Sequence, residues 1–179
     1  MTVEDAKRTQ RGVAHVVFLC TGNAARSVMA GAMLEAADAA VRITTAGTHV
    51  VENQPVSLRT RDALGAVGLS VSVHRSHQLT EDDVRDADLV VAMAAEHVSY
   101  VRRRHPSGAG RTATLRWLAR HLPGGPEPLS DRVAPLELGA LDPGDQGDVS
   151  DPAGGDSEDY AACVRELTVL MAELTPRLV

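Results

Sequence analysis

The sequence predicts an α/β fold built around a parallel β-sheet. Short apolar runs rich in β-branched residues alternate with segments whose apolar residues recur at helical spacing, which is typical of a parallel sheet covered by helices. The chain has 179 residues, enough for one domain with a substantial core. Hydrophobic residues make up 44% of it and aromatic residues only 2%, so we expect an aliphatic core.

Composition and length set further bounds on the kind of protein. Residues 1–12 are polar and charged, and we interpret them as a flexible leader before a single domain over residues 13–179. No apolar run reaches the length of a membrane span, and no signal peptide is visible. Two cysteines without framework spacing indicate free thiols, so we expect a cytoplasmic protein without a membrane partner. A net charge of −6 argues against nucleic-acid binding.

The first predicted element is a buried strand over residues 13–19, VAHVVFL, with Cys20 at its carboxyl end. The next residues, TGNAARS, form a short loop that leads into a helix, because apolar residues from Met29 to Ala36 recur at helical spacing. Ser27 is the predicted N-cap of this helix. The sequence thus predicts a strand, a tight loop and a helix in immediate succession.

This loop has the features of an oxyanion site. A loop that enters a helix offers unpaired backbone N–H groups and the positive end of the helix dipole. Gly22 lets the backbone approach a ligand, Asn23 tolerates a left-handed conformation, and the Arg26 guanidinium can clamp two oxygens. The same field stabilises a thiolate at Cys20, which then faces the bound group as a nucleophile. The predicted phosphate-binding set is Thr21, Gly22, Asn23, Ala24, Ala25 and Arg26.

Residues 20–27, CTGNAARS, resemble the C-x-G-N-x-x-R-S phosphate loop of the low-molecular-weight protein tyrosine phosphatases. That family shares its fold with the thioredoxin-linked arsenate reductases. The resemblance covers residues 13–105 and resumes at Asp151. It implies a four-stranded parallel sheet with helices on both faces, a phosphate-binding loop after the first strand, and a site at the carboxyl ends of the strands.

The segment after the first helix carries two residues that resemble supporting positions of the family. A second strand is predicted over residues 41–48, and Ser57 begins a helix that stops at Gly68. Thr45 corresponds to a family serine that hydrogen-bonds the asparagine of the phosphate loop. His74 stands at the family's structural histidine, which supports the loop through the same asparagine. The resemblance therefore implies supporting roles for Thr45 and His74.

Two more strands are predicted over residues 88–93 and 112–118, with a helix over residues 94–104 between them. This helix ends in three arginines, Arg102-Arg103-Arg104. Cations in a last turn complement the helix dipole, so we interpret the run as a solvated helix end.

A change of composition marks residues 122–150 as a Pro/Gly/Asp-rich insert. Six of the nine prolines lie between Pro123 and Pro152, and the stretch is longer than an ordinary loop. It is similar to an expanded variable loop of the family. The family's catalytic acid sits in an Asp-Pro dipeptide just before the last helix, and Asp151-Pro152 matches it in sequence and position.

The last helix is predicted to begin at Asp156 or Ser157 and to end before Pro176. One apolar face runs along it and comprises Tyr160, Cys163, Val164, Leu167, Leu170, Met171 and Leu174. Cys163 lies on this face, so we interpret it as a packing residue rather than a redox residue.

The resemblance implies a reaction for this set of residues. The Cys20 thiolate attacks phosphorus, Arg26 and the loop N–H groups hold the equatorial oxygens, and Asp151 acts first as an acid and then as a base. Ser27 eases departure of the Cys20 sulfur. The predicted function is a cysteine-dependent phosphatase that hydrolyses phosphate monoesters through a phosphocysteine intermediate. We expect no metal and no cofactor, because the loop amides and the arginine stabilise the charge.

The substrate is expected to be a phosphorylated protein or a smaller phosphate ester, with the oligomeric state left open. Family members usually carry an aromatic residue after the Asp-Pro dipeptide, which walls a slot for the phosphotyrosine ring. Here Ala153 follows instead, and residues 48–51 also lack an aromatic side chain. Phe18 and Tyr160 are predicted core residues, and Tyr100 and Trp117 lie outside the site loops. A preference for phosphotyrosine does not follow from these residues.

Two alternatives remain beside hydrolysis. An arsenate reductase uses a similar loop, but the thioredoxin-linked kind needs a further cysteine pair, and this chain has only Cys163 besides Cys20. A reductase that uses a small-molecule thiol stays open as an alternative. A non-catalytic phosphate or phosphoprotein binder is less well supported, because Cys20, Arg26 and Asp151 are all present.

Overall fold

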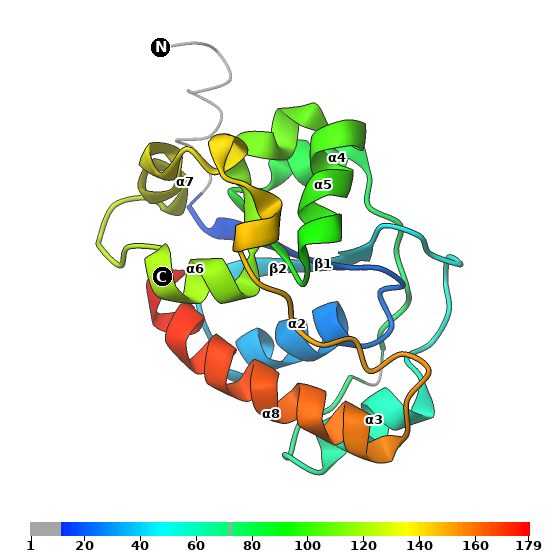
Figure 1. Ribbon diagram of the computed structural model, residues 1–179. Coiled ribbons are helices and arrows are strands. Elements are labelled where there is room, and N and C mark those ends of the chain that lie inside the picture. Colours follow the sequence, from blue (N-terminus) through cyan, green and yellow to red (C-terminus); the bar gives the residue numbers. More distant parts are fainter. Residues whose placement is uncertain (1–11, 72) are drawn as a thin grey trace.

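The computed structural model describes residues 12–71 and 73–179, and it contains a four-stranded parallel sheet in the order β2-β1-β3-β4 (Figure 1). The strands are β1 (Ala14–Cys20), β2 (Val41–Gly47), β3 (Leu89–Ala92) and β4 (Thr112–Thr114). In the register of the sheet, Cys20 pairs with Gly47 at the carboxyl ends of β1 and β2. The predicted parallel α/β fold is therefore confirmed.

Helices cover both faces of this sheet. They are α2 (Arg26–Ala36), α3 (Leu58–Gly65), α4 (Glu81–Asp86), α5 (Ala95–Arg104), α6 (Leu115–His121), α7 (Leu129–Val133) and α8 (Ser157–Leu174). In Figure 1, α4 and α5 lie on one side of the sheet, and α2, α3 and α8 lie on the other. No helix of the described segments is long and apolar enough to cross a bilayer.

Alternation along β1 explains the two layers, because successive side chains of a strand point to opposite faces. Val16, Phe18 and Cys20 belong to a large apolar cluster shared with α2 and α8. Val17 and Leu19 belong to a second cluster that includes Val84 of α4 and Val101 of α5. Both sides of β1 are buried, which accounts for its nearly continuous apolar sequence.

The last helix follows its sequence pattern closely. All seven residues of the predicted apolar face of α8 are buried. Asp156 is the N-cap and forms a capping box with Asp159. Cys163 is 2% exposed, and burial raises the pKa of its thiol to about 12, which fits the predicted packing role.

Two local predictions are wrong, and both fail because a hydroxyl has a different partner. The fourth strand stops at Thr114, whose side chain accepts a hydrogen bond from Trp117 N and caps α6, so residues 115–118 are helical. The N-cap of α2 is Ala25, not Ser27, and it makes no side-chain capping bond. The Ser27 hydroxyl instead faces Cys20, as described below.

The insert packs onto the rest of the fold. Leu129, Val133, Leu138 and Val149 belong to the large apolar cluster. Arg102 donates to the carbonyl oxygens of Leu138 and Leu141, which holds the insert against α5. Val149 N donates to Met93 O at the end of β3, at 2.8 Å. The segment that carries Asp151 is therefore fixed beside the carboxyl ends of the strands. The predicted leader over residues 1–12 lies, apart from Gly12, outside the described residues.

Candidate active site

The loop between β1 and α2 is organised around Asn23, which is fully buried. Its φ of 50° is in the left-handed region, as the sequence predicted. Its side chain donates from Nδ2 to Ser27 Oγ at 3.0 Å and accepts at Oδ1 from His77 N at 2.9 Å. His74 Nε2 lies 2.9 Å from the Asn23 carbonyl oxygen. These four residues fix the loop in shape.

The expected contact of His74 with Asn23 is thus present, but the expected bond from Thr45 is not. No hydrogen bond connects Thr45 and Asn23, both of which the structure describes. Thr45 instead presents its methyl group to α2, where a Cβ added to Gly31 would lie 2.7 Å from Thr45 Cγ2. Thr45 is therefore part of the contact between β2 and α2, and the prediction of a bond to Asn23 is wrong.

Cys20 lies at the start of the loop with its sulfur close to a hydroxyl. Its Sγ is 3.0 Å from Ser27 Oγ, and the residue is 3% exposed. Because the N-cap of α2 is Ala25, the first backbone N–H groups of this helix receive no bond from an N-cap side chain. Backbone N–H groups in the first turn of a helix that have no hydrogen-bond acceptor can bind an anion.

Arg26 brings the loop together with the segment after the insert. The buried guanidinium donates from Nη2 to Asp151 Oδ2 at 2.6 Å and from Nη1 to Val149 O at 3.3 Å. Asp151 is 44% exposed in its side chain, and its Oδ1 accepts from Ala153 N. Cys20, Arg26 and Asp151, predicted as one site from distant parts of the sequence, therefore gather at the same edge of the sheet.

Asp148, the acidic residue that precedes Asp151 in the sequence, makes different contacts. Its Oδ1 accepts from Ala95 N at the start of α5, at 2.8 Å, and its carbonyl oxygen accepts from Arg116 Nε. A carboxylate at the first turn of a helix is stabilised by the helix dipole. Asp148 therefore anchors the segment, whereas Asp151 reaches the arginine of the loop.

His97 is a site residue that sequence reasoning missed. It is 1% exposed, and its Nε2 lies 2.9 Å from Thr21 Oγ1, which also accepts from Arg26 Nη2 at 3.5 Å. Burial, and next the charge of Arg26, lower the pKa of His97 to about 4. A neutral His97 thus supports Thr21 from α5. The only available signal was a histidine shortly after the carboxyl end of a strand.

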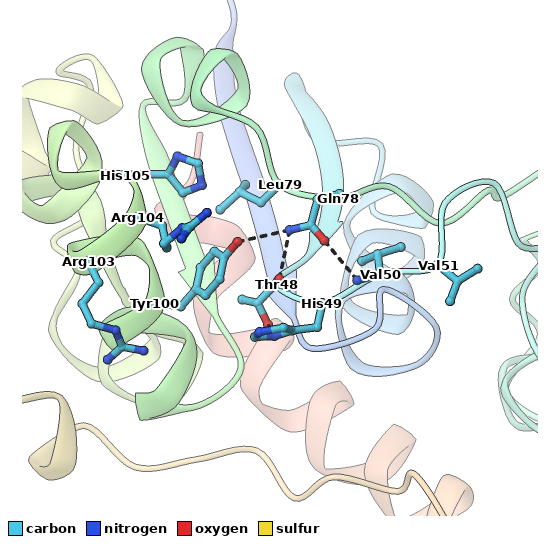
Figure 2. Close-up of a pocket in the computed structure, with 10 residues that line it drawn as sticks. All are labelled: Thr48, His49, Val50, Val51, Gln78, Leu79, Tyr100, Arg103, Arg104 and His105. Carbon is cyan, nitrogen blue, oxygen red and sulfur yellow. Dashed lines mark hydrogen bonds between the residues drawn. The ribbon is translucent and has the colours of Figure 1, made fainter.

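Tyr100 lies on α5 and not in a site loop, as expected, yet its ring reaches the loop after β2. The rings of Tyr100 and His49 meet edge to face, with centroids 5.5 Å apart. Both line a pocket of about 940 Å³ next to the phosphate loop (Figure 2). His49 N donates to Thr21 O, and Thr48 N donates to Cys20 O, so the wall of this pocket is bonded to the loop itself.

Comparison with known proteins agrees with this geometry. Residues 15–125 match the family model described as low molecular weight phosphotyrosine protein phosphatase. A protein-arginine-phosphatase of Geobacillus stearothermophilus is 30% identical over 91% of this chain and 95% of its own length. The low molecular weight protein-tyrosine-phosphatase Etp of Escherichia coli K12 is 30% identical over 58% of this chain and 70% of its own.

Solved structures show the same relationship. The YwlE arginine phosphatase from G. stearothermophilus superposes with a TM-score of 0.75, at 30% identity, over 92% of each chain. A low molecular weight protein tyrosine phosphatase from T. tengcongensis gives a TM-score of 0.70 at 30% identity, over 90% of this chain and 97% of its own. The chain therefore belongs to the low molecular weight phosphotyrosine protein phosphatase family and is a hydrolase of its cysteine-dependent class.

Proposed function

We propose that this chain is a protein phosphatase that removes the phosphoryl group from arginine side chains through a phosphocysteine intermediate. The proposed substrate rests on one observation, the chemistry of the residues that lie beside the phosphate loop. It is the Asp151 carboxylate followed by Pro152 and Ala153, with no aromatic ring in that segment. A carboxylate can accept hydrogen bonds from a guanidinium, whereas a phenyl ring gains more from an aromatic wall.

In the first half of the reaction, the Cys20 thiolate attacks phosphorus in line. The S–P bond forms as the P–N bond to the guanidine breaks, and protonated Asp151 gives its proton to the leaving nitrogen. Arg26 and the N–H groups of residues 21–26 hold the three phosphoryl oxygens, where charge must be stabilised. The incoming phosphoryl oxygens compete with Asp151 for Arg26 Nη2, so substrate binding frees this carboxyl group to face the leaving group.

In the second half, water attacks phosphorus and Asp151 takes a proton from that water. The S–P bond breaks, inorganic phosphate leaves, and the electron pair returns to Cys20 as thiolate. The Ser27 hydroxyl, 3.0 Å from Sγ, donates to this sulfur and makes it a better leaving group. Asn23 and His74 keep the loop in shape, since both bond within or onto it.

Acidic groups around the mouth also favour a cationic side chain as substrate. Glu96 is 71% exposed and its Oε1 lies 3.4 Å from Thr21 Oγ1. Together with Asp151, which contacts Arg26, it places two carboxylates beside the loop. The relatives that cover most of this chain include two named protein-arginine-phosphatase, from Geobacillus stearothermophilus and Bacillus subtilis. These facts support phosphoarginine over phosphotyrosine.

Arsenate reduction by an internal thiol relay is disfavoured. Such a relay needs a second thiol that can ionise and reach the first, because the thiolate is the reactive form. Cys163 is the only other cysteine, it is buried on α8, and burial raises its pKa to about 12.

Matched peptides test the substrate assignment. Two peptides of one sequence carry phosphoarginine or phosphotyrosine at the same position, and phosphate release gives kcat/KM for each. We expect the phosphoarginine peptide to be preferred by at least about tenfold, equivalent to roughly 1.4 kcal/mol. Equal values, or a preference for phosphotyrosine, would overturn this choice of substrate while leaving the cysteine mechanism in place.

A further inference from the structure

A cationic pocket lies beside the phosphate loop and takes no part in the chemistry above. Its volume is about 940 Å³, and it lies between the loop after β2 and the exposed side of α5 (Figure 2). The side chains of His49, Gln78, Tyr100, Arg103 and Arg104 contribute to its lining. None of its lining residues is acidic.

Two arginines give the pocket its charge. Arg103 and Arg104 are exposed, and neither forms an ion pair with any residue that the structure describes. Arg102 differs from them, because its guanidinium donates hydrogen bonds to the carbonyl oxygens of Leu138 and Leu141. The arginine run therefore divides into one structural residue and two that face the pocket. The helix dipole explains a basic last turn, but it does not explain why two of these residues line one cavity.

Most polar groups in the wall of the pocket are bonded to one another. Gln78 Nε2 donates to Tyr100 Oη and to Thr48 O, and Gln78 Oε1 accepts from Val50 N. The Tyr100 hydroxyl thus receives one bond and keeps its own hydrogen for a ligand. His105 is engaged with Glu81, at 2.8 Å. The guanidinium groups of Arg103 and Arg104 and the hydroxyl of Tyr100 therefore favour an occupant that accepts hydrogen bonds and carries negative charge.

The pocket is joined to the active site by short contacts. Thr48 and His49 donate their backbone N–H groups to Cys20 O and Thr21 O, each at 2.9 Å. On the opposite wall, α5 begins with Glu96 and His97, which contact Thr21, and continues to Tyr100 and Arg103. A chain that leaves the mouth of the site along α5 passes over the pocket.

We propose that this pocket binds an acidic side chain of the protein substrate, near the phosphorylated residue in its sequence; this rests on the proposed action on proteins. From Glu96 to Arg103 the helix rises about 10 Å, at 1.5 Å per residue. An extended peptide covers that length in about three residues. The substrate preferred by this pocket carries Asp or Glu about three positions from the phosphorylated residue.

The same arrangement orients the substrate. Carboxylates of Glu96 and Asp151 stand at the mouth, and the guanidinium groups of Arg103 and Arg104 stand at the other end of α5. A peptide whose phosphorylated residue carries a guanidinium and whose neighbour is acidic matches this order of charges. Complementary charges of this kind raise the rate of encounter and fix the register more than they raise affinity.

The test uses the full chain and two pairs of peptides. One pair carries phosphoarginine and the other carries phosphotyrosine. The first peptide of each pair has glutamate three positions before and three positions after the phosphorylated residue. The second peptide has glutamine at these positions. We expect kcat/KM to be about five- to tenfold higher for the glutamate peptide of a pair, and to lose this advantage as ionic strength rises. The double variant Arg103→Gln/Arg104→Gln is expected to lose the preference and keep its turnover of an aryl phosphate.

Arg120→Gln is the matched control, because Arg120 is also an exposed arginine in the last turn of a helix and does not line the pocket. It should retain the preference for glutamate. An equal rate on both peptides of each pair, or a preference that survives in the double variant, would overturn the assignment. Aryl phosphate turnover that persists without Cys20 would instead count against the proposed function.

Discussion

Arg26 Nη2 donates to Asp151 Oδ2 at 2.6 Å, across 125 positions of sequence. Arg26 is the first residue of α2, directly after the loop that follows β1, and Asp151 follows the insert. The contact joins the proposed acid to the arginine of the proposed phosphate site, and it also shows what holds the acid in the free protein. Phosphoryl oxygens are stronger partners for a guanidinium than a single carboxylate oxygen, so substrate binding redistributes these bonds.

Asp151→Asn should lower turnover by about 10²–10⁴-fold on substrates with poor leaving groups, because no proton reaches the leaving atom. The loss should be smaller for nitrophenyl phosphate, whose leaving group needs little protonation. Asp148→Asn is the control, since Asp148 bonds to Ala95 N and not to Arg26. Steady-state kinetics of both variants on an alkyl and an aryl phosphate decide the matter. Wild-type rates for Asp151→Asn on the alkyl phosphate would show that another group is the acid.

Acidification should destabilise the fold partly through His97. Burial and the charge of Arg26 lower the pKa of His97 from 6.5 to about 4, so the unfolded chain binds this proton more tightly. The free energy of unfolding should thus be independent of this group above pH 6.5 and fall as pH drops towards 4, by up to about 3 kcal/mol. His15 and His74, whose pKa values burial also lowers, act in the same direction.

Denaturant unfolding at several pH values between 7.5 and 4.5 measures this dependence. His97→Gln removes the titrating group and should flatten the curve relative to the wild-type chain, whatever its stability at pH 7.5. A variant with an unchanged slope would show that His97 is not the buried, neutral group described above.

Cys163→Ala should leave phosphatase activity nearly intact and lower stability by about 1–2 kcal/mol. Cys163 is buried on the apolar face of α8, so truncation leaves a small cavity, but its sulfur takes no part in the proposed reaction. Thermal unfolding and aryl phosphate kinetics are measured on the same preparation. If thiol-dependent arsenate reduction were detected and lost in this variant, the packing role would be wrong.

Ala153→Phe should lower KM for phosphotyrosine peptides, because an aromatic ring beside the mouth would bind the tyrosine ring in both ground and transition states. Ala153 is exposed and directly follows Asp151-Pro152, so the larger side chain has room. Small sugar phosphates should gain nothing. Unchanged kinetics on phosphotyrosine peptides would place Ala153 away from the substrate slot.

Much of the fold follows from local sequence, as α8 illustrates. Its apolar residues repeat at helical spacing over 18 residues, and every predicted face residue is buried. The strand β1 and the left-handed Asn23 follow in the same way from residue type and position. Cys20, Arg26 and Asp151 could be grouped through the family resemblance, although spacing alone cannot bring residue 151 to the loop.

Individual side-chain contacts in the folded chain account for what the sequence patterns could not predict. Ser27 is a good N-cap residue in isolation, but the fold brings its hydroxyl to Cys20 and Asn23. The pattern of residues 112–118 suits a strand, yet Thr114 caps α6 and ends it. His97 and Tyr100 sit on a helix whose position against the loop depends on packing of the whole sheet. The partners of His97 and Tyr100 are distant in sequence, whereas those of Ser27 and Thr114 are close in sequence.

The most direct test of the central claim is whether Cys20 carries the phosphoryl group during turnover. The reaction with an aryl phosphate is quenched with acid during turnover, and mass spectrometry of peptides from the protein locates the phosphorylated residue. Turnover of Cys20→Ser is measured in parallel. A melting curve checks that this variant is folded. A phosphoryl group on Cys20 and a folded, inactive Cys20→Ser variant are predicted. A phosphoryl group on a histidine or carboxylate, or wild-type turnover in Cys20→Ser, would contradict the phosphocysteine mechanism.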